Sequence, residues 1–126
     1  MDVDITYSGT DAAVVAVRGQ LDIDTAPVVR AAFEELGARM VIRIVVDLAG
    51  LDFCDSIGLS TLVVAHRRCA DAGGWVRVAG PTPFLVRLLS VVGVADAVPM
   101  YRTVEAAQHD DRSQLVPPDR DEIAAA

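Results

Sequence analysis

Apolar positions follow two patterns along the chain: short runs rich in valine and isoleucine, and longer segments with helical spacing. The short runs have the length and the β-branched content of strands. They occupy residues 3–7, 13–17, 42–48, 75–79 and 97–101. The first two flank a turn-forming segment, Ser8–Asp11, so we expect a β-hairpin that ends at Gly19. Pro99 lacks a backbone donor, so the last run is expected to be an edge strand.

Four segments with helical spacing lie between or after these runs. They begin near Thr25, Ile57, Thr82 and Thr103. The second is expected to run from Ile57 to Ala72 and to face the core with Leu59, Leu62, Val63, His66, Cys69 and Ala70. Strands that alternate with helices after a hairpin predict an α/β fold with right-handed crossovers. We therefore expect a mixed, mostly parallel sheet of about five strands, with about four helices.

The length of 126 residues suits one domain and a tail. We assign residues 1–108 to the domain. Residues 109–126 are polar and contain Pro117 and Pro118. Such a segment cannot bury enough apolar surface to offset its ordering entropy, so we expect a flexible, dispensable acidic tail.

Composition and charge narrow the choice of function. The net charge is −7 and every basic side chain other than histidine is arginine, so the chain should repel nucleic acid and anionic membranes. The acidic N-terminus does not resemble a signal peptide, and no apolar stretch could span a bilayer, which predicts a cytoplasmic protein. Cys54 and Cys69 are then free thiols. With only His66 and His109 besides, we expect no metal site and no cofactor.

The most informative segment lies where the predicted strand 42–48 gives way to a helix. Functional groups of α/β sheets gather at such carboxyl ends of strands. Ser56 is placed at the helix N-terminus, where unpaired amides and the helix dipole favour a phosphate. Asp55 can either cap the helix or orient the Ser56 hydroxyl. Gly58 lacks a side chain and allows another backbone or a bulky group to approach closely.

Three motifs in register give this chain a family resemblance. They are Asp55-Ser56-Ile57-Gly58-Leu59, Gly19-Gln20-Leu21-Asp22 followed by Thr25-Ala26-Pro27, and Ala72-Gly73-Gly74. Together they resemble the STAS domains of bacterial anti-sigma factor antagonists, over residues 3–108. The resemblance implies a single-domain STAS-like fold.

The resemblance also implies a mechanism of partner switching that regulates transcription. Such an antagonist binds an anti-sigma factor that is also a serine kinase, and thereby releases a sigma factor. Phosphorylation, here at Ser56, ends the interaction, and a phosphatase resets it. The implied switch loop comprises Asp22, Thr25, Asp52, Phe53, Asp55, Ile57 and Gly58. The chain itself would be a phosphoprotein and not an enzyme.

Other functions fit the residues less well. A serine hydrolase would need a G-x-S-x-G turn, and a nucleotide-binding domain a glycine-rich phosphate loop; neither motif is present. No nucleophile is paired in sequence with His66, which disfavours catalysis. The alternative that stays open is a STAS-type scaffold or a nucleotide-binding sensor module in a stress-signalling complex.

Overall fold

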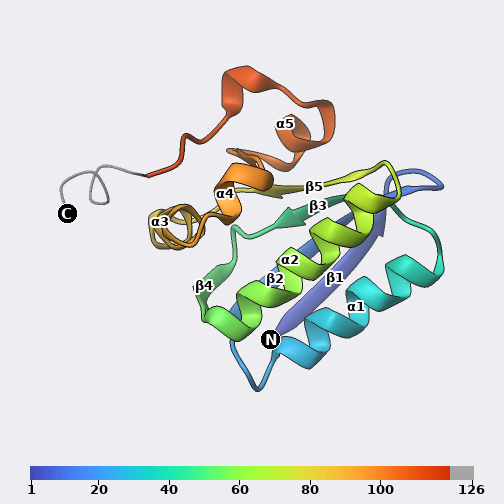
Figure 1. Ribbon diagram of the computed structural model, residues 1–126, viewed down its shortest axis with the longest axis horizontal. Helices are drawn as coiled ribbons and strands as arrows, with labels where there is room; N and C mark the ends of the chain where they lie inside the picture. The colour runs from blue at the N-terminus through green and yellow to red at the C-terminus, as the bar shows by residue number, and fades with distance from the viewer. Residues whose placement is uncertain (120–126) are drawn as a thin grey trace.

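The computed structural model describes residues 1–119, which form a mixed sheet of six strands with helices on both faces (Figure 1). The strands are β1 Asp2–Tyr7, β2 Ala12–Leu21, β3 Arg43–Asp47, β4 Leu51–Cys54, β5 Trp75–Ala79 and β6 Met100–Tyr101. The helices are α1 Ala26–Ala38, α2 Ser56–Asp71, α3 Pro83–Val91, α4 Val94–Ala97 and α5 Val104–His109, followed by a 3-10 turn at Arg112–Gln114. The predicted α/β class is confirmed.

The sheet has the order β1-β2-β3-β5-β6, and β4 pairs with the far end of β2. Only the hairpin pair β1–β2 is antiparallel; the other pairings are parallel, as expected. The prediction that the hairpin ends at Gly19 is confirmed, because the antiparallel β1–β2 pairing runs only to Arg18. Gly19 has a positive φ of 105°, and β2 continues through it to Leu21. At this bend β2 leaves β3 and takes β4 as its parallel partner.

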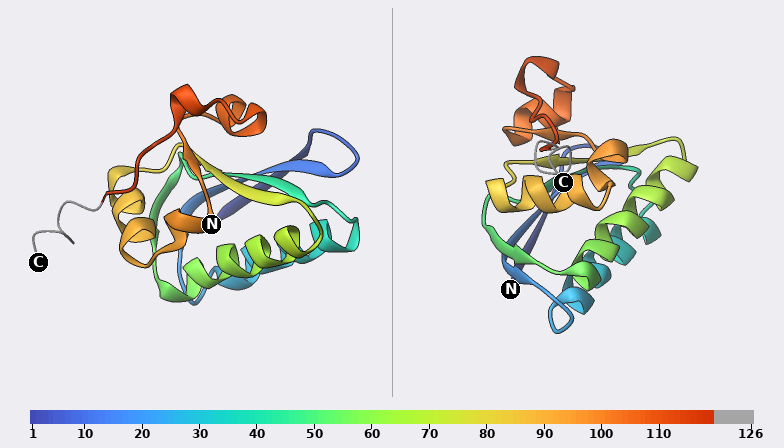
Figure 2. Two further views of the ribbon diagram at one scale, coloured as in Figure 1. Left: turned by 45° about the horizontal axis from the view of Figure 1, so that its top comes forward. Right: turned by 60° about the vertical axis from the view of Figure 1, so that its left-hand side comes forward.

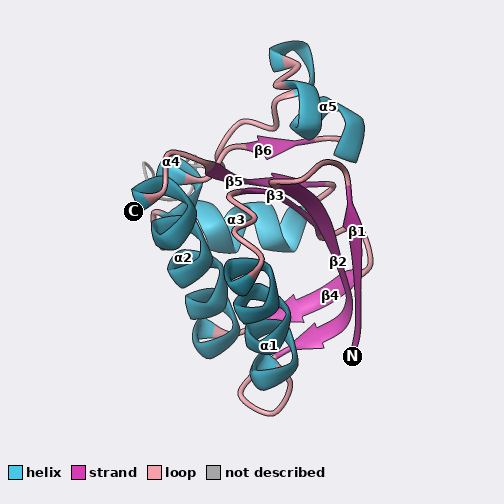
Figure 3. Cartoon of the chain, turned by 90° about the vertical axis from the view of Figure 1, so that its right-hand side faces the viewer, coloured by secondary structure: helices cyan, strands magenta, loops and turns pink. Residues whose placement is uncertain are grey.

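The two faces of the sheet are covered unequally. Helices α1 and α2 lie on one face, and α5 lies on the other (Figure 2, left; Figure 3). The main core between the sheet and α1, α2 and α3 includes Val15, Phe33, Ile44 and Leu62. A smaller cluster on the opposite face joins Tyr101 and the alanines of α5 to β3 and β5. The first cluster fixes α2 on the sheet and thereby fixes the position of its N-terminus.

The helix after Ser56 was predicted at the right place but with a partly wrong inner face. Ala65 is buried, whereas Ala70 is exposed. Successive helical residues are turned by about 100°, so Ala70 points away from the sheet that Cys69 contacts. Arg68 is only partly exposed, and its Nη1 donates to the Val41 carbonyl at 3.0 Å.

Two short elements replace predicted loops or strands. β4 lies between the predicted strand 42–48 and the helix that follows it, where the sequence predicted no strand. The predicted strand 97–101 is reduced to β6, because Pro99 has no amide to donate and α4 occupies the residues before it.

The segment after α5 holds defined contacts where the sequence predicted a flexible tail. The amide of Arg102 donates to the Gln114 carbonyl at 2.9 Å, and the amide of Val116 donates to the Met100 carbonyl at 2.8 Å. Leu115 forms an isolated antiparallel bridge with Tyr101. Residues 114–116 therefore lie along β6, and the rest of the predicted tail, 120–126, is outside the described residues.

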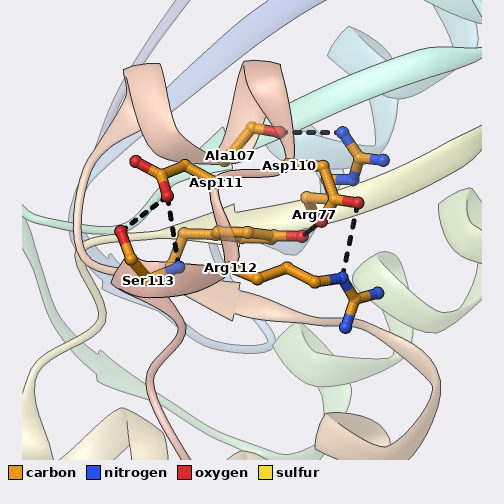
Figure 4. A network of polar contacts seen from close by, with 7 residues as sticks. Arg77, Ala107, Asp110, Asp111, Arg112 and Ser113 are labelled. Carbon is orange, nitrogen blue, oxygen red and sulfur yellow. Dashed lines mark hydrogen bonds and ion pairs between the residues drawn. The ribbon is translucent and has the colours of Figure 1, made fainter.

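A polar network reinforces this C-terminal region (Figure 4). The buried Tyr101 hydroxyl donates to the carboxylate of Asp110, which also pairs with Arg112 at 3.6 Å. Arg77 Nη1 donates to the carbonyl of Ala107 at 2.9 Å. Asp111 caps the 3-10 turn by accepting from the amide of Ser113 at 3.1 Å. These side chains satisfy one another and hold α5 and residues 110–114 on the sheet.

Candidate functional site

The bend in β2 brings two distant loops together. Leu21 pairs with Cys54 in the β2–β4 ladder, and the amide of Asp55 donates to the Leu21 carbonyl at 3.1 Å. The loop that starts at Asp22 therefore lies directly beside the start of α2. The carboxyl ends of β2 and β4 meet here, at the lower left of the sheet in Figure 1.

Asp55 is the N-cap of α2. Its backbone is extended, with φ −101° and ψ −177°, and its Oδ1 accepts a hydrogen bond from the amide of Gly58 at 2.8 Å. This geometry decides between the two roles left open by the sequence in favour of capping. Ser56 is consequently the first residue of the helix, and its side chain is exposed. Its hydroxyl has no hydrogen-bond partner within residues 1–119.

Gly58 serves the packing inside the domain. A Cβ at this position would lie 2.5 Å from Leu21 Cγ and 2.7 Å from the Leu21 carbonyl oxygen. The residue is buried, so the backbone that it admits is that of β2. The sequence predicted the close approach of another backbone or a bulky group, and here the backbone of β2 makes that approach: Gly58 lets the first turn of α2 pack against Leu21.

The loop between β2 and α1 is fixed by its own side chains. Asp22 Oδ1 accepts from the amides of Asp24 and Thr25, at 3.0 and 3.1 Å. Thr25 occupies the N-cap position of α1 but makes no capping bond to the helix. Its Oγ1 donates instead to the Gln20 carbonyl at 2.8 Å. Both predicted loop residues thus stiffen the loop, whose tip presents the exposed side chain of Ile23.

Exposed apolar side chains surround Ser56. Phe53 of β4 and Ile57 of α2 are 41% and 42% exposed, and Asp52 also faces solvent. The ring of Phe53 stacks on Phe84, with centroids 5.9 Å apart and planes inclined by 19°. Phe84 belongs to the helix predicted after Thr82, and its place at the site was not predicted. Its first-turn position at the end of β5 was the available signal.

We call the exposed part of this region the switch surface. It comprises Ile23, Asp24, Asp52, Phe53, Ser56, Ile57 and Phe84. Asp22, Thr25, Asp55 and Gly58 support it from within the two loops and the first turn of α2.

The neighbouring thiol does not add a nucleophile to this surface. Burial, and secondarily the charge of Asp55, raise the pKa of Cys54 to about 11. Its Sγ donates to the Asp55 carbonyl at 3.4 Å. The thiol is therefore neutral near pH 7 and is not a reactive thiolate.

Two further features of residues 1–119 concern metal ions and membranes. No three histidine, cysteine, aspartate or glutamate side chains gather in that part of the chain as metal ligands. No helix within it is long and apolar enough to cross a bilayer.

Comparison with known proteins identifies the family. The family model described as "Mlab, STAS domain" matches residues 5–102. An anti-sigma F factor antagonist of Paenibacillus polymyxa is 32% identical over 89 residues, which cover 70% of this chain and 76% of the relative. An anti-sigma-B factor antagonist of Listeria monocytogenes is 28% identical over 98 residues, covering 78% of this chain and 86% of the relative.

Solved structures show the same fold. A putative anti-sigma factor antagonist from Thermotoga maritima superposes with a TM-score of 0.79 at 21% identity, covering 87% of this chain and 94% of that one. The Bacillus cell fate determinant SpoIIAA in its phosphorylated form gives a TM-score of 0.69 at 19% identity, covering 90% of this chain and all of the other. At these identities the structures establish the fold alone. On the evidence of the family model and the relatives, the chain belongs to the STAS domain family, and its relatives are anti-sigma factor antagonists.

Proposed function

We propose that this chain is an anti-sigma factor antagonist, switched off by phosphorylation of Ser56. It binds an anti-sigma factor that is also a serine kinase, and the sigma factor held by that kinase is released. The observation that carries the proposal is the exposed hydroxyl of Ser56, which has no partner within residues 1–119, on the first residue of α2 and next to the capping Asp55. The chain acts in the cytoplasm by binding, without catalysis of its own.

The proposed modification is compatible with the fold. The kinase transfers the γ-phosphoryl group of ATP to Ser56 Oγ, a bond to phosphorus forms as the bond to ADP breaks, and the hydroxyl proton passes to a base of the kinase. The phosphate gains from the dipole and the free amides at the helix start. Because Ser56 is exposed and makes no internal hydrogen bond within the described residues, its modification breaks no contact of the domain.

Phosphorylation is expected to lower the affinity of the complex with the kinase. It adds about −1.5 to −2 charges at neutral pH beside Asp52 and Asp55. In the complex with the kinase it also faces the ADP from which it came. Burying a charge without a counter-ion in an interface costs about 2–5 kcal/mol, or roughly 30- to 4000-fold in affinity. A separate phosphatase then restores the binding form.

The relatives support this assignment. Two of them are named antagonists of anti-sigma factors, and SpoIIAA, which has the same fold, is described in a phosphorylated form. The rigid loop at Asp22 and the exposed Phe53 and Ile57 supply a surface for a protein partner around the proposed phosphosite.

Titration of the purified anti-sigma factor kinases of the source organism tests the proposal. Wild type is expected to bind one of them, to accept one phosphate from ATP on Ser56 and then to be released. Ser56→Ala should stay bound in ATP, and Ser56→Asp should bind at least about 30-fold more weakly. Ser60→Ala, an exposed serine one turn further along α2, is the matched control and should behave as wild type.

Calorimetry gives the affinities, and mass spectrometry gives the position of the phosphate. Binding of Ser56→Asp within threefold of wild type, or a phosphate on another residue, would overturn the switch. Failure of the wild type to bind any of the kinases would overturn the assignment as an antagonist.

A further inference from the structure

Two of the three phenylalanines of this chain stand on the surface and touch each other. Phe53 comes from β4 and Phe84 from the first turn of α3, and they remain 41% and 48% exposed. The third, Phe33, is buried in the core. Burial of both rings would gain hydrophobic free energy, yet the fold leaves them in solvent as a stacked pair. Exposed aromatic side chains of this kind are enriched where proteins bind one another.

The charged side chains in the two loops of the site are of one sign. The two loop segments of the site, residues 20–25 and 51–60, contain four aspartates and no arginine or histidine. Asp24 and Asp52 are exposed, whereas Asp22 and Asp55 are partly buried as acceptors for backbone amides. A second copy of this surface would bring like charges together, so the pair is poorly suited to join two copies of this chain.

We propose that the Phe53–Phe84 pair is the anchor through which this chain holds its protein partner, and that the partner offers an apolar pocket bordered by arginine or lysine side chains that pair with Asp24 and Asp52 and leave the phosphate on Ser56 without a counter-ion. The proposal rests on the proposed function, since the partner meant is the same anti-sigma factor. It extends the binding surface from the loop before α2 to α3, which no motif of the sequence indicated. The stack fixes both rings before binding, so little side-chain freedom is lost when they are buried.

The anchor and the phosphate act side by side on one interface. Three peptide units separate Phe53 from Ser56, so their Cα atoms are at most about 11 Å apart. A partner seated on the rings therefore covers Ser56 as well. The two contributions are nevertheless separable, because Phe84 belongs to a different helix from the phosphosite. Loss of the ring at position 84 should weaken the complex and leave the phosphorylation of Ser56 possible.

The test uses the anti-sigma factor that binds the wild-type chain in the titrations above. Phe53→Ala and Phe84→Ala are each expected to lower the affinity by at least about 30-fold, as for a central interface residue. Phe84→Tyr retains the ring and should stay within about fivefold of wild type. Val64→Ala is the matched control: Val64 is 64% exposed on the outward side of α2, away from the rings, and its truncation should change affinity less than about threefold. Circular dichroism verifies that every variant is folded.

The dependence of the affinity on salt concentration tests whether basic side chains border the partner's pocket. The affinity of the wild type should fall as salt rises from about 50 mM to 500 mM, because basic side chains of the partner meet aspartates. An affinity that does not fall with salt would overturn the basic border of the pocket.

The remaining outcomes separate this inference from the proposed function. If Ser56→Asp weakens binding but Phe84→Ala binds within threefold of wild type, the ring pair is not the anchor and the antagonist assignment stands. If no anti-sigma factor binds the wild type, both fall together. If sedimentation shows a wild-type dimer that Phe84→Ala dissociates, the rings form a self-association surface and the proposal is overturned.

Discussion

The switch surface and the C-terminal region around Tyr101 both gather aromatic and charged side chains from distant segments, but they use them in opposite ways. At Tyr101 the ring is buried, its hydroxyl donates to Asp110, and that carboxylate also pairs with Arg112. Around Ser56 the stacked rings are exposed and the hydroxyl has no partner within the described residues. Interactions made inside the molecule stabilise the fold, whereas groups left in solvent remain available to another protein. Changes in the first region should therefore alter stability, and changes in the second should alter binding.

Removal of residues 111–126 should give the largest effect on stability. It deletes the backbone hydrogen bonds that join Gln114 to Arg102 and Val116 to Met100, and the apolar contacts of Leu115. At about 1 kcal/mol for each hydrogen bond and for the apolar contact, the loss is about 3 kcal/mol, or a fall in Tm of about 10 °C. Binding by the folded protein should be unchanged.

A chain that ends at Asp119 is the control for this truncation, because it keeps all of these contacts. Thermal melting followed by circular dichroism compares the two. A fall of less than about 3 °C on removal of 111–126 would restore the interpretation of this segment as a dispensable tail.

Gly58→Ala should cause the next largest loss of stability. This substitution tests whether the glycine serves packing inside the domain. Alanine ordinarily stabilises a helix relative to glycine by about 1 kcal/mol. Here its Cβ would lie 2.7 Å from the carbonyl oxygen of Leu21, so we expect a loss of about 1–3 kcal/mol instead. Gly37→Ala in α1 is the matched control, because its Cβ would meet only the side chain of Arg68, at 3.2 Å. Equal stability changes at the two positions, measured by urea unfolding, would contradict the packing role.

Gly58 also illustrates how much of this molecule its sequence predicts. The serine motif marked the right helix terminus, because capping and helical spacing are local properties of the chain. The reason for the glycine was not local: Leu21 reaches it only because β2 bends at Gly19 and pairs with β4. β4 itself is four residues long and pairs with β2 alone. Such a short strand has no hydrophobic periodicity from which it could be predicted.

Contacts between distant segments also explain why the sequence predicted neither the place of Phe84 in the switch surface nor the order of residues 109–119. Phe84 joins the switch surface by stacking on a residue of another strand, which spacing within α3 cannot reveal. Residues 109–119 have little apolar content, and their order depends on backbone pairing with β6 and on the buried Ser90, whose Oγ accepts from the amide of Asp119 at 2.9 Å. Tertiary contacts between distant segments decided both.

Tyr101→Phe should give a smaller loss of stability with a characteristic pH dependence. The hydrogen bond from Tyr101 holds the pKa of Asp110 below its usual range, while burial, followed by the same hydrogen bond, raises the pKa of Tyr101. A depressed carboxyl pKa contributes stability above about pH 4, lost as the pH falls through the folded value. A raised phenol pKa contributes stability below about pH 10, lost as the pH rises through the folded value.

The Tm difference between wild type and Tyr101→Phe should thus be about 4 °C between these limits and shrink on either side of them. Arg112→Ala, which removes only the exposed ion pair at 3.6 Å, should change Tm by less than about 2 °C. A Tm difference for Tyr101→Phe that is the same at pH 3 and pH 7 would show that the hydroxyl contributes through packing alone.

Ser56→Asp should have the smallest effect on stability, although it is expected to have a large one on binding. The added carboxylate lies on the first residue of α2, where the helix dipole favours a negative charge by about 0.3–1 kcal/mol. Repulsion from Asp52 and Asp55 offsets part of that gain, and no hydrogen bond of Ser56 within the described residues is lost. We expect Tm to stay within about 2 °C of wild type. Ser56→Ala, measured in the same melting experiment, separates loss of the hydroxyl from gain of the charge. A fall of more than about 5 °C for Ser56→Asp alone would mean that the charge disturbs α2, so that its weaker binding would report local unfolding and not a switched interface.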